Sequence, residues 1–392
     1  MWIILKLKMS MKSDKKKRLV VFNQHSSFIT IDIVNALVSK NCYQEIVLVT
    51  GVVNERDDLL DKSVIVEKTV PYKKNSFYTR LLSWLTAFFK FIWVLTFKYR
   101  KSDVLLVTNP PLISFFPYFS CKRKYSVLVF DIYPDALSAG GFISNKSIIY
   151  KIWSRANRTL YRKASHIYTI SDGMKKRLSQ YVDIEDIEVV PLWSSFSPEI
   201  IEKESNLFLK ENAFQNSFIV MYSGNMGKGS GLESIIDVAN GLKSYDDIVF
   251  LFVGDGWSVP ILKDKVKKMN LSNCRFMPYQ DVSILRHSLS AADVAVISLP
   301  GQTGTISIPN KLYTLIALGR PLLCLTPPDT DLYNVIKKYE IGCCFETSEV
   351  DLMIQYILKI RNNESYKLKL THNSINASKA FSKDNSKKID IV

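Results

Sequence analysis

Short apolar runs alternate with helical patterns along most of this chain. In the first half, the apolar runs predict strands at residues 19–22, 45–50, 104–108, 126–130, 166–170 and 187–190. Apolar residues with helical spacing lie between them, near residues 29–39, 77–99, 147–163 and 173–180. Short apolar strands connected through helices are typical of a parallel, doubly wound sheet. We therefore expect an α/β domain in this half.

The second half repeats the alternation. Its predicted strands lie at residues 218–222, 248–253, 274–277, 294–298 and 322–325, with helices near 232–242, 259–269, 283–289, 310–318 and 332–339. Because 392 residues exceed the usual size of one core, we expect two domains. We place the first domain at residues 1–195, a linker at 196–216, the second domain at 217–372 and a polar tail at 373–392 that packs back on the first domain.

Charge divides the two halves more sharply than apolar content does. The chain has a net charge of +15, and residues 1–195 hold 30 Lys and Arg against 16 Asp and Glu. Residues 196–392 hold 22 against 21, so the positive potential belongs to the first half. An anionic membrane surface or a phosphorylated acceptor would suit it. No zinc-finger spacing or RNA-binding aromatic motif accompanies the charge, and we expect no nucleic-acid partner.

Cysteine and histidine usage gives no sign of a metal site. The six cysteines include no C-x-x-C pair, and the four histidines are scattered along the chain. We expect reduced core thiols, no metal and no cofactor, in a cytoplasmic protein. The first residues carry too short an apolar run for a signal peptide, which agrees with this location.

Two predicted helices of the first half have features that are relevant to membrane binding. Residues 77–100 are the most hydrophobic segment. They predict either a buried helix of the first domain or a helix in the membrane interface, with Trp84 and Trp93 at headgroup depth.

The second of these helices carries a basic stripe. Lys151, Arg155, Arg158 and Arg162 recur at helical spacing on one face, opposite Ile149, Ile152, Trp153, Ala156 and Leu160. Such a stripe is either a solvated face or a surface for anionic lipid.

A glycine-rich turn follows the first strand of the second half. Gly224, Asn225, Gly227 and Lys228 lie where that strand passes into a helix. The spacing matches neither the Walker A loop nor G-x-G-x-x-G. Glycines there still let the backbone approach a ligand, with the helix N-terminus beside it.

A second strand-to-helix turn begins at proline. Pro309, Asn310 and Lys311 open a helix that Gly319 closes, and proline fits a first turn because its missing amide had no partner there. The free amides of that turn, with Lys311, suit a diphosphate. Two such turns in one α/β half predict a nucleotide-diphosphate pocket.

Other polar residues follow predicted strands, where ligands of open α/β sheets gather. Gly254 and Asp255 end one strand of the second half, and Met277 and Tyr279 end the next and could face a nucleobase. In the first half the corresponding positions hold His25, Asn109, Asp131 and Asp135. Asp131 and Asp135 are suited either to polar chemistry or to capping a turn.

Five segments together resemble a known family. They are YSGNMG followed by GLE, VGDG, AADVAVISL, IPNKLYTLIALGRPLL and FDIYPDAL. The chain resembles the fourth family of retaining, nucleotide-sugar-dependent glycosyltransferases. It is most similar to bacterial enzymes of O-antigen, capsule and colanic-type polysaccharides, including the N-acetylfucosaminyl transferase branch.

The resemblance implies a GT-B architecture, in which two Rossmann-like domains face each other across a cleft. The second domain would hold a nucleotide sugar, expected to be UDP-linked. The first domain would hold a lipid-diphosphate-linked acceptor at the inner face of the plasma membrane. Transfer would retain the anomeric configuration without metal. Lys311 would neutralise the leaving diphosphate, with Lys228 as second choice, and Asp131 would be the catalytic carboxylate.

Three positions depart from the family pattern. Thr314 stands where many members carry a Glu that contacts the donor ribose, and Ser307 lies near the position of its paired Glu. Phe130 replaces a His that precedes Asp in many members. Two alternatives therefore stay open, a nucleotide-sugar 2-epimerase on the same fold and a non-catalytic GT-B-like partner subunit. The basic stripe counts against the epimerase, which needs no membrane.

Overall fold

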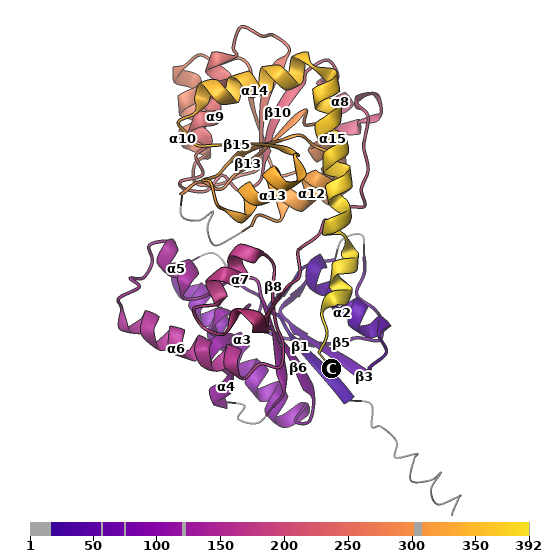
Figure 1. Cartoon of the computed structure of the whole chain (residues 1–392), viewed down its shortest axis with the longest axis vertical. Coiled ribbons are helices and arrows are strands. Elements are labelled where there is room, and N and C mark those ends of the chain that lie inside the picture. The colour runs from indigo at the N-terminus through magenta and orange to yellow at the C-terminus, as the bar shows by residue number, and fades with distance from the viewer. Residues whose placement is uncertain (1–16, 56–57, 74–75, 120–122, 302–307, 392) are drawn as a thin grey trace, which may run out of the picture.

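The chain folds into two α/β domains (Figure 1). The computed structural model describes residues 17–55, 58–73, 76–119, 123–301 and 308–391. The C-terminal helix runs down one side of the second domain and reaches the first (Figure 1). Ser307, which the sequence places on the donor side, lies outside the described residues. So do Cys121 and the N-terminal segment 1–16.

The first domain is built on a seven-stranded parallel sheet in the order β5-β3-β1-β6-β7-β8-β9. Leu19 to Phe22 are fully buried, because helices cover both faces of a parallel sheet. Its strands are β1 (Lys17–Phe22), β3 (Tyr43–Thr50), β5 (Ile65–Lys68), β6 (Asp103–Val107), β7 (Tyr125–Val129), β8 (Ile167–Thr169) and β9 (Ile187–Val189), with β2 (His25–Ser26) and β4 (Val52–Val53) paired apart. Its helices are α2 (Phe28–Ser39), α3 (Phe77–Trp93), the π-helical η1 (Val94–Lys98), η2 (Pro111–Phe115), α4 (Phe116–Phe119), α5 (Asp135–Ala139), α6 (Ile148–Arg162), α7 (Asp172–Leu178) and η3 (Ile184–Asp186).

The second domain has a six-stranded parallel sheet in the order β12-β11-β10-β13-β14-β15. Its strands are β10 (Phe218–Ser223), β11 (Ile248–Val253), β12 (Cys274–Met277), β13 (Val294–Ser298), β14 (Leu322–Leu325) and β15 (Gly342–Phe345). Its helices are α9 (Leu232–Gly241), α10 (Val259–Lys268), α11 (Val282–Ser290), α12 (Lys311–Ala317), α13 (Asp331–Tyr339), α14 (Val350–Asn362) and α15 (Glu364–Ser378). The predicted doubly wound fold is confirmed, although β5 and β15 were not predicted.

The carboxyl ends of the two sheets face each other. The amide of Gly173, at the start of α7 just beyond β8, donates a hydrogen bond of 2.8 Å to Asp331 Oδ1. Asp331 begins α13, the helix after β14. Residues that follow the strands of either sheet therefore lie toward the space between the domains.

The structure differs from the predicted linker. Residues 196–216 were expected to be a connection, but they contain η4 (Lys203–Ser205) and α8 (Leu207–Glu211). Phe208 and Leu209 are buried, and Asn206 Nδ2 donates to the carbonyl of His287 on α11. The later part of this segment therefore packs as part of the second domain.

The predicted boundary at residue 372 falls inside α15. That helix buries Thr371, Ser374 and Ala377 along with Leu370, so its inner face is mostly small or hydroxylated and gives little apolar periodicity. Two short 3-10 helices follow, η6 (Lys379–Phe381) and η7 (Lys383–Lys388).

The last residues pack on the first domain. Tyr168 Oη donates to the carbonyl of Asp390 at 2.6 Å, and Lys40 Nζ donates to the carbonyl of Ile389 at 2.9 Å. Ile389 is fully buried and Ile391 is 8% exposed within the core of the first sheet. The tail is thus a structural part of the first domain.

The hydrophobic helix is both a core helix and an exposed one. The segment Tyr78–Lys98 has the length and composition of a membrane span, yet Ala87, Phe91 and Val94 are fully buried against the first sheet. Its outer side exposes Leu82, Phe89 and Phe97 by 65%, 55% and 73%.

Of the two tryptophans predicted at headgroup depth, only Trp93 is exposed. Trp84 is buried, and its ring stacks on Tyr72 with centroids 6.1 Å apart. The five described cysteines are free thiols, and Cys42 is exposed rather than part of the core.

Candidate functional site

The glycine-rich turn interlocks with the turn after the next strand. The amide of Gly224 donates to the carbonyl of Val253, and the amide of Met226 donates to the carbonyl of Asp255. A side chain at Gly254 would place its Cβ 2.2 Å from the carbonyl oxygen of Gly224. The two turns approach this closely only because glycine has no Cβ. They form one rigid surface at the carboxyl edge of the second sheet.

Lys311 joins the two turns that the sequence predicted separately. Its ammonium lies 4.1 Å from the centroid of the Tyr222 ring, a cation–π contact. A Cβ at Gly224, where φ is +145°, would lie 2.7 Å from Lys311 Nζ. Tyr222 was missed by the sequence analysis, although it directly precedes the Ser-Gly of this motif. Its hydroxyl donates to the carbonyl of Asn225 at 2.8 Å and anchors the turn.

Burial changes the acidity of Lys311. Desolvation lowers the pKa of this ammonium from 10.5 to about 8. Among the described residues, no carboxylate lies within ion-pair distance of it. The amides of Asn225, Gly227 and Lys228 have no backbone acceptor within the described part of the chain. A partly shielded cation beside free amides is suited to a phosphate-bearing ligand.

The remaining donor-side residues surround this point. Tyr279 packs near Gly254 and is 57% exposed, and the carbonyl of Met277 accepts the Gly254 amide. Asp255 is exposed, and its carboxylate accepts the Gly256 amide, as in a turn. Lys228 is exposed, and its ammonium lies 5.6 Å from the ring centroid of Trp257.

The Lys311 helix is shorter than its sequence predicted. It spans Lys311–Ala317, so Asn310 is the N-cap and Pro309 precedes the helix instead of opening it. Thr314 follows one turn after Lys311 and is half-buried. The left-handed Gly319, with φ of +67°, ends the helix as predicted.

In the first domain, Asp131 lies just beyond β7 at the carboxyl edge. Its carboxyl group keeps exposed surface but is otherwise surrounded by protein, and desolvation raises its pKa. Burial also raises the pKa of neighbouring Tyr133, with the charge of Asp131 adding to the effect and that of Arg80 opposing it. Arg80, on α3, has a buried Nε without a hydrogen-bond partner among the described atoms.

The neighbouring Tyr133 belongs to an aromatic pair. Trp84 packs edge-on against Tyr133, with centroids 6.1 Å apart. The sequence analysis missed Arg80 and Tyr133, and the available signal for Arg80 was a cation within an otherwise apolar helix.

Asp135 does not line this region, contrary to its prediction as an acceptor residue. It is 1% exposed, and its Oδ1 accepts hydrogen bonds from Tyr150, Arg177 and Gln180. The Tyr181 hydroxyl donates to Oδ2 at 2.5 Å. Asp135 therefore ties α5 to α6 and α7, which leaves little capacity for a ligand.

Asn109 lies beside Asp131, because the hydroxyl of the preceding Thr108 accepts hydrogen bonds from the amides of Phe130 and Asp131. His25 is half-buried in β2, and the carbonyl of Asn109 accepts the Gln24 amide at 2.8 Å. On α6, Lys151, Arg155, Arg158 and Arg162 are exposed, as predicted, and Trp153 and Leu160 are buried.

The division of α6 into two faces is only partly as predicted. Ile149 and Ile152 were placed on the packed face but are 56% and 55% exposed, because α6 extends past the sheet at its N-terminal end. No cluster of three or more His, Cys, Asp or Glu side chains that could hold a metal occurs among the described residues.

Comparisons with known proteins found similar glycosyltransferases. Residues 204–380 match the family described as Glycosyl transferases group 1. A Pseudomonas aeruginosa protein provisionally named as the glycosyltransferase WbjE is 25% identical over 69% of this chain and 68% of its own. An Escherichia coli (strain K12) protein provisionally named as the colanic acid biosynthesis glycosyl transferase WcaI is 24% identical over 50% of this chain and 49% of its own.

Solved structures share the whole architecture. WaaG, a glycosyltransferase involved in lipopolysaccharide biosynthesis, superposes with a TM-score of 0.66 at 12% identity, over 92% of this chain and 95% of its own. Anabaena Alr3699/HepE, in complex with UDP, gives a TM-score of 0.69 at 13% identity over 95% and 97%. Residues 204–380 are therefore similar to group 1 glycosyltransferases, within a chain of GT-B fold.

Proposed function

We propose that this chain transfers a sugar from a UDP-sugar to a lipid-diphosphate-linked saccharide during surface polysaccharide biosynthesis, with retention of anomeric configuration. One observation supports this proposal most directly. Lys311 and the Gly224 turn meet at the carboxyl edge of the second sheet, which faces the first domain. HepE in its complex with UDP, and relatives named for lipopolysaccharide and colanic acid synthesis, support this choice.

The donor side works by fixed electrostatics. Charge grows on the diphosphate as the bond to the sugar breaks, and preorganised donors lower that barrier. Lys311 supplies a cation, and the free amides of Asn225, Gly227 and Lys228 supply hydrogen bonds. The glycines keep Cβ atoms away, so the diphosphate reaches the backbone directly. This arrangement performs the charge neutralisation without a metal ion.

The acceptor side centres on Asp131. The surrounding protein raises its pKa by desolvation, and its exposed surface leaves the carboxyl group accessible, as expected of a group that exchanges protons with a substrate. Asp131 would position the attacking hydroxyl. Tyr133 and Trp84 would pack on a saccharide, and Arg80 would contact the acceptor's diphosphate.

The first domain would bind the cytoplasmic face of the plasma membrane. It carries most of the net charge of +15, and α3 exposes Leu82, Phe89 and Phe97. A surface that combines cations with exposed apolar side chains matches an anionic lipid interface. A lipid-linked acceptor would then reach the cleft without leaving the bilayer.

The test of the donor site is a UDP titration of wild type and Lys311→Ala. Loss of a charge-assisted contact costs about 1.5–3 kcal/mol, so UDP affinity should fall roughly 10- to 150-fold. Lys359→Ala is the matched control, because Lys359 Nζ also lies 4.1 Å from an aromatic centroid, that of Tyr366, on an exposed helix face. Equal affinities for wild type and Lys311→Ala would remove this assignment.

Two further measurements separate the alternatives. UDP binding should be the same with and without EDTA, and strict dependence on Mg²⁺ or Mn²⁺ would contradict the proposed chemistry. Mass spectrometry of lipid-linked intermediates in a strain lacking this chain should reveal an accumulated saccharide one sugar short. Its absence would favour an enzyme without a lipid-linked acceptor.

A further inference from the structure

A large cavity lies on the outer side of the first domain, apart from the donor site. Its volume is about 850 Å³, and it is formed mainly by η2, α4, α6 and the segment after α7. None of its lining residues comes from the second domain. The volume is within the range of cavities that take small organic ligands.

The cavity is positively charged. Lys151, Arg155 and Arg158 line it, and none of the described residues that line it is acidic. Within the described ranges, no acidic side chain forms an ion pair with these three cations. Arg158 contacts one aromatic face, with its guanidinium 5.9 Å from the Tyr181 centroid. These cations can therefore receive an anion.

The floor of the cavity is rigid and electrically compensated. Tyr150, Gln180 and Tyr181 line it, and each donates a hydrogen bond to the buried Asp135. Arg177 forms an ion pair with the same carboxylate at 3.0 Å. Because these partners occupy Asp135, its negative charge does not neutralise the cations on α6.

The rim of the cavity is apolar and exposed. Ile148, Ile152 and Tyr118 are 73%, 55% and 53% exposed, and all three line the cavity. The apolar strip continues to α3, because the ring of Phe119 on α4 contacts those of Phe88 and Phe89, at 5.5 Å and 6.5 Å between centroids. Exposed apolar strips of this kind mark contact with a partner or a membrane.

We propose that this cavity seats the headgroup of one anionic phospholipid, with the phosphate on Arg155 and Arg158 and the acyl chains along Ile148, Ile152 and Tyr118. The combination of unmatched cations with an adjoining apolar strip selects an amphiphile. A nucleic acid would leave the apolar rim exposed, and a free phosphate would leave it unused. The inference extends the membrane association proposed above from a diffuse surface to a defined lipid site.

The test compares two double variants that lose the same charge, one within α6 and one at its C-terminal end. Arg155→Gln with Arg158→Gln removes two cations from the cavity. Arg162→Gln with Lys163→Gln removes two exposed cations that do not line it. On vesicles of phosphatidylcholine with phosphatidylglycerol, diffuse attraction alone would weaken both variants equally, by roughly fivefold per residue. A defined site predicts at least about tenfold greater loss for the cavity variant.

A second measurement uses short-chain phosphatidylglycerol as dispersed monomers. Wild type and the Arg162/Lys163 variant should bind it saturably with one site, and the Arg155/Arg158 variant should not. Glycerol phosphate, which lacks acyl chains, should bind more weakly than the lipid. Equal losses on vesicles, or no saturable binding of monomeric lipid by wild type, would overturn the proposal. Circular dichroism checks that both variants fold like wild type, which we expect because the substituted side chains are exposed.

UDP titration of the same proteins keeps the two proposals distinguishable. The cavity lies outside the donor site, so all variants should bind UDP as wild type does. Failure of lipid binding with intact UDP binding would overturn only the lipid site. Failure of UDP binding with intact lipid binding would overturn only the donor assignment.

Discussion

At the scale of single residues, Lys311 is a cation that the protein largely shields from solvent. Its ammonium is surrounded by protein, rests on the Tyr222 ring and has its pKa lowered to about 8 by burial. Placing a charge in such surroundings is unfavourable until an anion arrives. A diphosphate would supply the missing charge, so binding and relief of this cost would occur together.

The lowered pKa predicts how UDP binding depends on pH. Lys311 is charged below its pKa and neutral above it, so affinity should fall as pH rises through about 8. Lys311→Arg keeps the charge, because a guanidinium stays protonated at these pH values, and its alkaline decline should disappear. Calorimetric titration from neutral to alkaline pH measures both profiles. An identical alkaline decline in the two proteins would mean that another group titrates.

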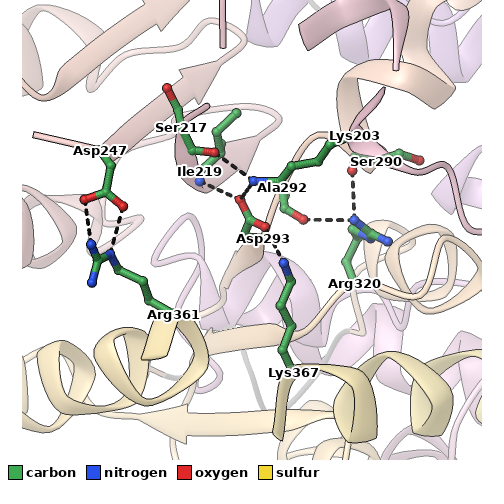
Figure 2. A network of polar contacts seen from close by, with 10 residues as sticks. All are labelled: Lys203, Ser217, Ile219, Asp247, Ser290, Ala292, Asp293, Arg320, Arg361 and Lys367. Carbon is green, nitrogen blue, oxygen red and sulfur yellow. Dashed lines mark hydrogen bonds and ion pairs between the residues drawn. The ribbon is translucent and has the colours of Figure 1, made fainter. Parts of the chain in front are cut away.

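At the scale of elements, one buried carboxylate connects several elements of the second domain. Asp293, at the start of β13, is 1% exposed (Figure 2). It accepts hydrogen bonds from Lys203 Nζ at 2.7 Å, Lys367 Nζ at 2.8 Å and the amide of Ile219 at 2.9 Å. One side chain thereby joins the η4 segment, α15, β10 and β13.

Arg320 and Asp247 extend this network. Arg320 Nη1 donates to the carbonyls of Ser290 and Ala292 and so closes the turn before β13 (Figure 2). Asp247 pairs with Arg361 on α14 at 2.8 Å and is more exposed than Asp293. Sequence patterns identify none of these partners, because each pair spans a long stretch of chain.

Replacing Asp293 should destabilise the second domain strongly. Asp293→Ala leaves two lysines facing a buried gap, and breaking a buried pair in this way costs about 3–5 kcal/mol. Asp247→Ala is the control, because its pair with Arg361 is partly open to solvent and such a pair is worth about 1 kcal/mol or less. Urea unfolding of both variants measures the difference. Comparable small losses would show that Lys203 and Lys367 find solvent instead.

At the scale of the whole molecule, the first domain is completed by the end of the chain. The η7 segment packs on α2, and Lys383 forms an ion pair with Asp58 at 2.6 Å. The indole of Trp193, in the connection between the domains, donates to Asp32 on α2 at 2.7 Å. The two crossings between the domains therefore meet at the same helix.

This arrangement predicts that Ile389→Ala weakens the first domain. Truncating a buried isoleucine costs about 2–5 kcal/mol, and Ile389 is fully buried. Asp384→Ala, at an exposed position that pairs with Lys387, should leave the unfolding transition unchanged. Thermal unfolding measures both, and UDP binding should remain because the donor site is in the other domain. An unchanged transition for Ile389→Ala would mean that the tail is not needed by the core.

Much of the fold could be predicted because its signals are local. β11, β12, β13 and β14 have the bounds that their apolar runs gave, since buried parallel strands are apolar on both faces. β15 was missed because Gly342, Cys343 and Cys344 carry little strand signal. α15 was not predicted, and the domain boundary was placed inside it, because its buried face is largely small and hydroxylated.

The sequence by itself determined two doubly wound domains, the excess of positive charge in the first half, and the two turns that carry Gly224 and Lys311. Each of these depends on neighbours in the chain, where periodicity and turn chemistry act. Only the tertiary structure decided that Lys311 lies against Gly224, that Asp135 holds helices together, and that Ile152 is exposed beside a basic cavity. Such contacts depend on how distant elements pack, and local side-chain patterns do not encode that packing.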